Sequence, residues 1–306
     1  MTAGQLATGP PPEFERAADA ISQLVRALDE QVMTLGPPWP AGSRVASEVV
    51  DDPLFAGRWG TRPVQDATMS GLLALHIAED HLIGIAALIL APDTVFTPLT
   101  LSRTVLAASA RSYWVLDPAI AGRERLRRAM NVQLQSYRER SGLLDDGPSE
   151  DRDRLARLTL QIVQTAPKHG FVMGKGRPGR SRLWPERWLD ERIPSEMQMV
   201  EQLLRAEGEA GIGNLAYRSA SAIVHAQPHG VGMLTIEASG PSVNGVSPGR
   251  IGISIATLTR YLAAAVFGVH LAGRRAVNHA GQSIADWDRA VQPALQTWAE
   301  LMRVEH

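Results

Sequence analysis

Apolar residues recur every three or four positions along most of the chain, and the runs that they form stop at glycine or proline. The first run extends from Phe14 to Leu35 and ends at Gly36-Pro37-Pro38. This spacing places the apolar side chains on one helix face, so it predicts an amphipathic helix. Similar runs predict further helices over residues 66–90, 97–116, 122–141, 149–167, 195–207, 214–227, 257–277 and 283–301.

Strand patterns are scarce, and they fall in a single stretch of the chain. Between residues 231 and 255, two short apolar runs, 233–236 and 251–255, flank a segment rich in glycine and proline. This arrangement predicts one small β-hairpin, with a long ordered loop as the alternative. Strands do not alternate with helices as a parallel sheet would require. The sequence therefore predicts an all-α protein built as an irregular multi-helix bundle.

Proline and polar segments suggest two regions. Residues 36–65 carry five prolines and little periodicity, which is typical of an irregular connection. We therefore expect residues 1–65 to form a leader, an amphipathic helix and a proline-rich connection, and residues 66–306 to form a helical bundle domain. The leader lacks the basic start and apolar core of a signal peptide. The most apolar stretch, Leu82 to Ala91, is shorter than the ~20 residues needed to cross a bilayer. We expect a cytoplasmic protein without membrane association.

Composition narrows the chemistry that the chain can perform. Its 306 residues are 44% hydrophobic and 21% charged, which is ordinary for a globular protein with a full core. The 31 basic and 32 acidic residues give a net charge of −1, so a nucleic-acid site would have to be a local patch. Cysteine is absent, which excludes disulfides, thiolate metal sites and a thiol nucleophile.

Residues 168–187 are predicted to form a basic, glycine-rich loop. Gly170-Phe-Val-Met-Gly174-Lys175-Gly176 is similar to a phosphate-binding loop, but its glycine spacing is one residue short and no Ser or Thr follows the lysine. We therefore expect a solvated surface loop or a segment that contacts nucleic-acid phosphates. The basic residues proposed to bind substrate in this loop are Lys175, Arg177 and Arg180.

Arg218 and His225 form the main candidate site. They are seven residues apart in the predicted helix 214–227, so they share one face with Ser221 and Ala222. The small residues between them leave room for a phosphate group or a second helix. A guanidinium and an imidazole in this arrangement suit phosphodiester chemistry. The alternative is structural, with the arginine paired to an acid and the histidine placed at the negative end of the helix.

A second Arg and His pair is held in reserve. Arg274 and His279 are five residues apart, at the end of the predicted helix 257–277. Arginine is frequent in this chain, so such pairs also arise by chance. We prefer the first pair, because it lies within a helix and has small residues between its members.

Four ionisable residues interrupt the most apolar predicted helix: His76, Glu79, Asp80 and His81. Burying them without partners would cost several kcal/mol, so we expect Arg103 or Arg111 of the next helix to pair with them. The four-residue spacing of the first His and the Asp would suit a divalent metal, but no third ligand is identifiable. We expect no metal and no cofactor. Five further arginines are expected to form a solvated helix face: Arg123, Arg125, Arg127, Arg128 and Arg138.

The segment Tyr217-Arg-Ser-Ala-Ser-Ala-Ile-Val-His225, on a late helix of an all-α chain, resembles the Arg-x6-His motif of the HEPN superfamily. Taken with the stretch 97–117, the segment is also similar to a group of uncharacterised actinobacterial helical proteins, and the similarity covers residues 66–280. It implies a HEPN-like helical core, a homodimer in which two motifs face a shared cleft, and metal-independent endoribonuclease activity. By the same resemblance, Arg218 stabilises charge on the scissile phosphate and His225 acts as acid or base, beside Tyr217 and Ser221. Ser219 departs from the amide or acid that many members have after the arginine.

Two other classes of function remain open. The family also contains inactive domains used only for binding. The chain is also consistent with a non-catalytic helical dimer or scaffold, for example one that binds a toxin, a nucleotidyltransferase-type protein or a cognate neutralising partner. Alternatively, Tyr113 and Trp114 would line a pocket for a small ligand, although aromatic packing is their default interpretation.

Overall fold

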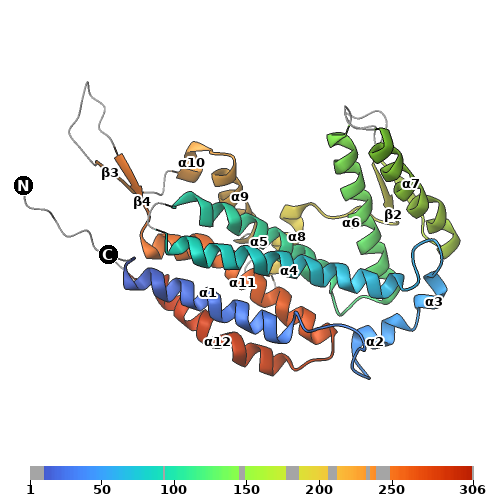
Figure 1. The fold of residues 1–306 in the computed structure, drawn as a ribbon, viewed down its shortest axis with the longest axis horizontal. Helices are drawn as coiled ribbons and strands as arrows, with labels where there is room; N and C mark the ends of the chain where they lie inside the picture. Colours follow the sequence, from blue (N-terminus) through green and yellow to red (C-terminus); the bar gives the residue numbers. More distant parts are fainter. Residues whose placement is uncertain are drawn as a thin grey trace, which may run out of the picture.

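The computed structural model describes residues 10–91, 94–144, 149–176, 186–205, 212–231, 235–238 and 249–304 (Figure 1). Helices dominate this part of the chain. They are α1 (Pro12–Gln31), α2 (Arg44–Val49), α3 (Asp52–Phe55), α4 (Pro63–Ile89), α5 (Phe96–Val115), α6 (Gly122–Leu143), α7 (Ser149–Thr165), α8 (Glu196–Arg205), α9 (Ile212–Val224), α10 (Pro228–Val231), α11 (Ile255–His279), α12 (Ile284–Leu301) and the 3₁₀-helix η1 (Ala166–His169). The prediction of an all-α, multi-helix protein is confirmed.

The predicted hairpin is also confirmed. Strands β3 (Thr235–Ala238) and β4 (Gly249–Gly252) pair antiparallel within residues 231–255. A second antiparallel pair, β1 (Met173–Lys175) and β2 (Arg187–Leu189), lies where the sequence predicted only a loop. The described ends of the 168–187 segment are therefore ordered. Arg177 and Arg180 lie outside the described residues.

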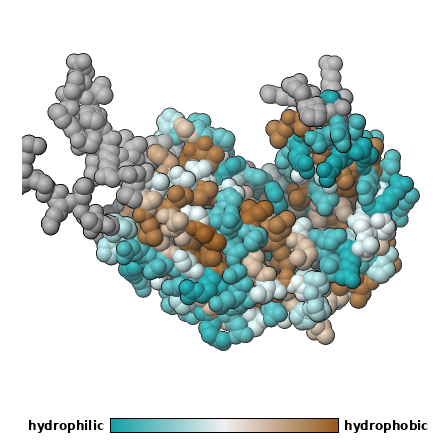
Figure 2. Space-filling model, in the orientation of Figure 1, coloured by the Kyte–Doolittle hydropathy of each residue, from teal (hydrophilic) through white to brown (hydrophobic). Residues whose placement is uncertain are grey.

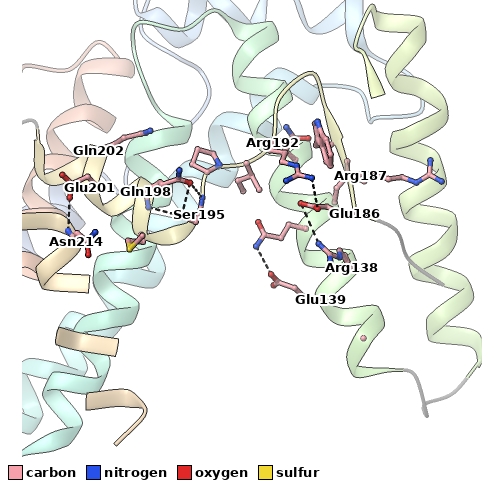
Figure 3. Close-up of a pocket in the computed structure, with 18 of the residues that line it drawn as sticks. Arg138, Glu139, Glu186, Arg187, Arg192, Ser195, Gln198, Glu201, Gln202 and Asn214 are labelled. Atoms are coloured by element: carbon pink, nitrogen blue, oxygen red, sulfur yellow. Dashed lines mark hydrogen bonds and ion pairs between the residues drawn. The ribbon is translucent and has the colours of Figure 1, made fainter. Parts of the chain in front are cut away.

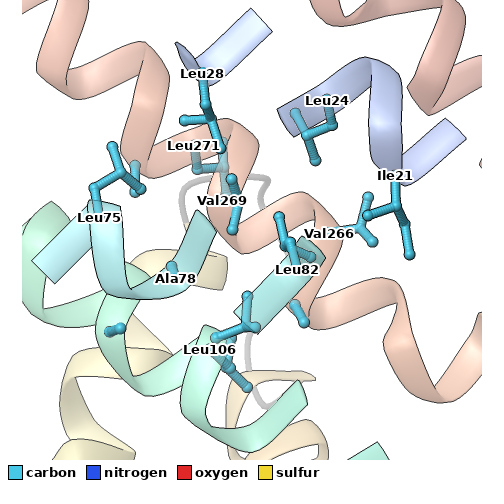
Figure 4. Close-up of a cluster of buried hydrophobic side chains, with 14 of the residues drawn as sticks. Ile21, Leu24, Leu28, Leu75, Ala78, Leu82, Leu106, Val266, Val269 and Leu271 are labelled. Carbon is cyan, nitrogen blue, oxygen red and sulfur yellow. The ribbon is translucent and has the colours of Figure 1, made fainter. Parts of the chain in front are cut away.

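The long helices α4, α5 and α11 form the centre of the bundle, and α1 and α12 cover one side of it. Figure 4 shows Ile21 and Leu24 of α1 facing Leu82 of α4 and Val266 of α11. These side chains are buried because each helix turns its apolar stripe inward. The sequence placed a domain boundary at residue 65, and that division stays a prediction. The structure shows that α1 contributes to the same hydrophobic core as the helices beyond it.

Serines and prolines set several helix ends, as the sequence indicated. Ser283 accepts a hydrogen bond from the Asp286 amide at the start of α12, 3.2 Å away. In contrast, α5 begins at Phe96 without a side-chain cap, although the Thr97-Pro98 pair in the sequence would suit a helix start with Thr97 as the cap. The connection predicted over residues 36–65 contains α2 and α3. Ser43 caps α2 by accepting a hydrogen bond from the Ala46 amide.

A second, smaller core lies between α6, η1, β2 and the N-terminal end of α4. It contains Phe55, Trp59, Leu126, Phe171 and Leu189. Figure 1 shows α6, α7 and β2 standing beside the main bundle at one end of α4. The two cores therefore share α4, which runs from one to the other.

Two helices of the described chain, α4 and α11, are long and apolar enough to span a membrane. In each, half or more of the most apolar window is buried in the protein, 50% in α4 and 61% in α11. Central helices of a packed bundle have the same composition, so length and composition do not distinguish a core helix from a membrane-spanning helix.

The arginines of α6 correct an expectation from the sequence. Arg125 was predicted to lie on a solvated face, but its side chain is fully buried and Arg127 is nearly so. Arg125 Nε lies 2.7 Å from Glu48 Oε2, and its guanidinium also donates to the carbonyl oxygens of Val115 and Asp117. Five donors on a guanidinium need several acceptors when buried, and α2 and the end of α5 supply them. These arginines therefore connect α6 to the rest of the protein.

Candidate functional site

Helix α9 carries the predicted pair, and it packs on α5 and α8. The helix ends at Val224, one residue before His225, although the His225 amide still donates to the Ser221 carbonyl oxygen at 3.0 Å. Ala226 then adopts a left-handed conformation with φ 49°. The chain turns away at this point, and Pro228 starts α10. His225 therefore lies at the end of the helix instead of inside it.

Arg218 and His225 line one open cavity, which we call the α9 cavity. It has a volume of about 460 Å³ and is lined by Met197, Tyr217, Arg218, Ser221, Ala222, His225 and Gln227. Both Arg218 and His225 are exposed to solvent. Arg218 makes no hydrogen bond or ion pair with another described residue, so the predicted alternative of a structural ion pair is not seen in this part of the chain. The structure thus brings together Arg218, Ser221 and His225.

Tyr217 lines the α9 cavity with its ring, and its hydroxyl makes contacts that the sequence did not predict. Its hydroxyl donates to Glu196 Oε2 at 2.9 Å and accepts from an Arg103 nitrogen at 2.9 Å. The Arg103 guanidinium also lies over the phenol ring, 5.2 Å from its centroid. Burial raises the pKa of the Tyr217 hydroxyl, so this group stays protonated. The ring borders the α9 cavity, while the hydroxyl connects α9 to α5 and α8.

Lys175, which was also predicted to bind substrate, does not line the α9 cavity, and Arg177 and Arg180 lie outside the described residues. Lys175 is exposed on β1, where it pairs in register with Arg187 of β2.

The reserve pair does not form a site. Arg274 is exposed and its Nε lies 3.1 Å from Asp288 Oδ1. His279 is buried, and that burial lowers its pKa to about 3, with a further contribution from the positive charges of Arg125 and Arg44. The nearest carboxylate oxygen, Glu48 Oε2, is 4.0 Å from His279 Nε2. A neutral, enclosed imidazole of this kind cannot meet a substrate together with an exposed guanidinium.

The ionisable cluster on α4 is also arranged differently from the prediction. Glu79 is buried and its Oε2 lies 3.0 Å from His76 Nδ1. The expected partners Arg103 and Arg111 instead approach Glu196 of α8, at 3.5 and 3.9 Å. The prediction of an arginine partner for the cluster is therefore wrong, because these arginines project toward α8. Within the described ranges, no group of three or more potential metal ligands is present.

The aromatic pair proposed for a small-ligand pocket is engaged in packing. Trp114 is buried beneath the Arg128 guanidinium, which lies 5.0 Å from its ring centroid. The Arg275 guanidinium lies 3.3 Å from the centroid of the Tyr113 ring. Both rings therefore carry a cation on one face, which agrees with their default interpretation as packing residues.

A larger cavity was not anticipated from the sequence. It lies between α6, α8 and residues 186–195, has a volume of about 1130 Å³, and is named here the α6–α8 cavity (Figure 3). Arg138 and Arg192 both approach Glu186, at 4.0 and 3.5 Å. The Arg192 guanidinium also lies 4.3 Å from the Trp188 ring centroid. The only signal for this cavity in the sequence was the clustering of arginine and tryptophan around residue 187.

Charge argues against the α6–α8 cavity as a groove for a polyanion. Four arginines line it, at positions 138, 187, 192 and 205, but so do three glutamates, at positions 139, 186 and 201. The charges nearly cancel, whereas grooves that hold nucleic acid are strongly basic. The α9 cavity, in contrast, has Arg218 and His225 on its wall and no acidic side chain in its lining.

Comparison with known protein families, curated proteins and solved structures finds no match to this chain. The candidate site therefore rests on the geometry of its own residues.

Proposed function

We propose that the protein binds single-stranded RNA and cleaves it in the α9 cavity, with Arg218 and His225 as the catalytic residues. One observation carries this proposal. The two side chains are exposed, line the same cavity and have no carboxylate beside them in its lining. A guanidinium and a titratable imidazole are the groups that phosphodiester cleavage by a neighbouring 2′-hydroxyl requires.

The reaction would proceed by internal transfer at phosphorus. The ribose 2′-oxygen forms a bond to the phosphorus, the bond from phosphorus to the 5′-oxygen breaks, and the products are a 2′,3′-cyclic phosphate and a free 5′-hydroxyl. His225 would either take the proton from the 2′-hydroxyl or give one to the 5′-oxygen, and water would exchange the other proton. Imidazole suits both tasks, because its ordinary pKa of about 6.5 is close to neutral pH.

Arg218 would hold the reacting phosphate. Its guanidinium presents several donors in one plane, which match two phosphate oxygens at once. Charge accumulates on these oxygens in the transition state, so an unpaired guanidinium contributes most at that point. Ser221 lies between the two residues along the helix and adds a hydroxyl to the same wall of the cavity.

The test is cleavage of a labelled single-stranded RNA by the purified full chain in the presence of EDTA. We expect Arg218→Ala and His225→Ala each to lower the cleavage rate by about 100-fold or more. Arg289→Ala is the matched control, because Arg289 is exposed and forms an ion pair with Asp286 of its own helix. Its rate should equal that of the unmodified protein.

Product analysis separates this mechanism from contaminating nucleases. The expected product ends are a 2′,3′-cyclic phosphate and a 5′-hydroxyl, and substrates with a 2′-deoxyribose at the cleaved position should be inert. Equal cleavage by the His225→Ala variant would refute the role of this histidine. RNA binding without cleavage in the unmodified protein would reduce the proposal to a binding function.

A further inference from the structure

Helix α4 exposes an apolar stripe along the face that it turns away from the bundle. The stripe consists of Met69, Leu73, Ile77, Ile83 and Ala87. Leu73 and Ile83 are the most exposed of its large side chains, at 58% and 52%. Figure 2 shows hydrophobic patches, broken by polar residues, over the band that α4 occupies in Figure 1. A stripe of this length on a helix surface is typical of an interaction site.

The stripe has an internal symmetry about Ala78. Ala78 points into the core and is fully buried, so the opposite side of the helix faces outward at the same height. At about 100° per residue, positions 69 and 87 point directly outward, and positions 73 and 83 lie about 40° to either side. The members of two pairs, Met69 with Ala87 and Leu73 with Ile83, therefore lie at equal distances from this centre, and each pair is apolar. Ile77 lies at the margin of the stripe, about 80° from the outward direction, and its counterpart is the buried Glu79.

The polar residues within the stripe follow the same symmetry, with an imidazole on one side of Ala78 and a carboxylate on the other; the imidazole Nδ1 also lies 3.0 Å from Glu79 Oε2. His76 and Asp80 lie two residues on either side of Ala78 and about 20° from the outward direction. Both are exposed, and the Asp80 side chain is 80% accessible. Asp80 Oδ2 lies 3.9 Å from His81 Nδ1 of the same helix. An axis through the outward face at Ala78 thus exchanges a potential cation with an anion.

We propose that a second copy of this chain packs on α4, with the two α4 helices antiparallel and related by a two-fold axis opposite Ala78. In this arrangement His76 faces Asp80 of the partner subunit, and Leu73 faces Ile83 of the partner subunit. A two-fold interface requires this kind of self-complementarity, in which a residue and its counterpart exchange roles. Charged residues at the centre of the stripe would oppose insertion into lipid, but they complement each other across such an axis.

A groove beside the stripe offers a place for the partner's side chain. Between α1 and α4, a cavity of about 400 Å³ is lined mainly by apolar residues, which include Val25, Ile83, Ala86 and Leu90, together with Asp19 and Ser22. Because Ile83 borders this groove, its contact with Leu73 of the partner subunit would lie at the edge of the groove. The interface would then bury the exposed side chains of both helices in a continuous apolar layer.

This surface is separate from the α9 cavity, so the inference does not depend on the proposed cleavage. Helix α5 packs against both α4 and α9, and Figure 1 shows it between them. The dimer cleft implied by the HEPN resemblance would instead surround Arg218 and His225. The symmetry of the α4 stripe favours α4 as the contact between copies.

The first measurement is the mass of the protein in solution by light scattering during size-exclusion chromatography. We expect a dimer, and we expect Leu73→Glu and Ile83→Glu each to shift it to monomer with an unchanged circular dichroism spectrum. Leu54→Glu is the matched control, because Leu54 is 67% exposed on α3, away from the stripe. A monomeric unmodified protein, or a dimer that survives both stripe substitutions, would overturn the proposal. Monomers that bind phosphatidylcholine–phosphatidylglycerol vesicles through the stripe would overturn it as well.

Cysteine cross-linking tests the register, and the natural chain has no cysteine to interfere. We expect His76→Cys protein and Asp80→Cys protein, mixed and oxidised, to form a disulfide-linked dimer much faster than either variant alone. Glu30→Cys on the exposed surface of α1 is the control for random collision. If the mixture cross-links no faster than the separate variants, the antiparallel arrangement about Ala78 is wrong.

Discussion

Arg125 Nε lies 2.7 Å from Glu48 Oε2 in the interior of the protein, where both side chains are almost fully removed from solvent. The pair joins α6 to α2 across 77 positions of the sequence. Removing one partner of a buried ion pair leaves an uncompensated charge, which costs far more than the pair contributes when intact.

We therefore predict that Glu48→Ala lowers the free energy of unfolding by about 3–5 kcal/mol. Arg274→Ala, which removes the exposed pair with Asp288, should lower it by about 1 kcal/mol or less. Urea denaturation followed by circular dichroism measures both. Similar losses for the two variants would show that the buried pair has no special importance.

The spatial role of Arg125 also shows what the sequence could not reveal. Helix positions follow from apolar spacing and from prolines such as Pro118, which are local signals. Whether an arginine on a helix is solvated or buried depends on acceptors far away in the chain, here Glu48 and the Val115 carbonyl oxygen. A helix face rich in arginine was therefore interpreted as solvent-exposed, although its centre is buried.

In the candidate site, too, features that depend on helical spacing could be predicted, whereas contacts with residues far away in the sequence could not. Arg218, Ser221 and His225 were predicted to share a face from helical spacing alone, and they line one cavity. The role of Tyr217 was missed, because it depends on Arg103 of α5 and Glu196 of α8. Strands of three residues such as β1 and β2 are too short to show the alternation of apolar and polar residues that identifies a strand. The basic segment between them favoured the prediction of a loop.

Tyr217→Phe separates the structural role of this residue from a role in catalysis. The substitution removes the hydrogen bonds to Glu196 and Arg103, and we expect the free energy of unfolding to fall by about 1–2 kcal/mol. Because the ring remains at the wall of the α9 cavity, RNA cleavage below the unfolding transition should change little. A loss of cleavage comparable to that of His225→Ala, in a stably folded variant, would instead assign the hydroxyl to catalysis.

Replacing glycine by alanine should change the free energy of unfolding in opposite directions at two positions of the chain. Gly273→Ala places a methyl group into the indole ring of Trp287, inside the contact between α11 and α12. We expect a loss of about 1–3 kcal/mol from this overpacking. Gly142→Ala, on α6, meets no atom within 4 Å and should raise stability by about 0.5–1 kcal/mol, because alanine restricts the unfolded chain and favours the helix. Thermal unfolding of both variants gives the comparison, and equal shifts would contradict the packing argument.

His279 predicts how stability changes with acid. Burial lowers its pKa to about 3 in the folded protein, against 6.5 for an unperturbed histidine. As the pH falls below 6.5, the histidine of the unfolded chain therefore binds a proton, whereas in the folded protein it stays neutral until the pH approaches 3. Between these values the histidine lowers the free energy of unfolding by about 1.4 kcal/mol per pH unit, and above pH 6.5 it has no such effect.

The test is to replace His279 by leucine, which removes the titration while filling most of the same buried volume. Both ring nitrogens of His279 lack a hydrogen-bond partner among the described residues, so the substitution breaks no such bond there. Urea denaturation at several values between pH 7.5 and pH 5 measures the free energy of unfolding of both proteins. This free energy should fall less steeply with falling pH in His279→Leu than in the unmodified protein, and the difference in slope should correspond to the uptake of about one proton. Identical slopes for His279→Leu and the unmodified protein would mean that the buried imidazole accepts its proton without resistance.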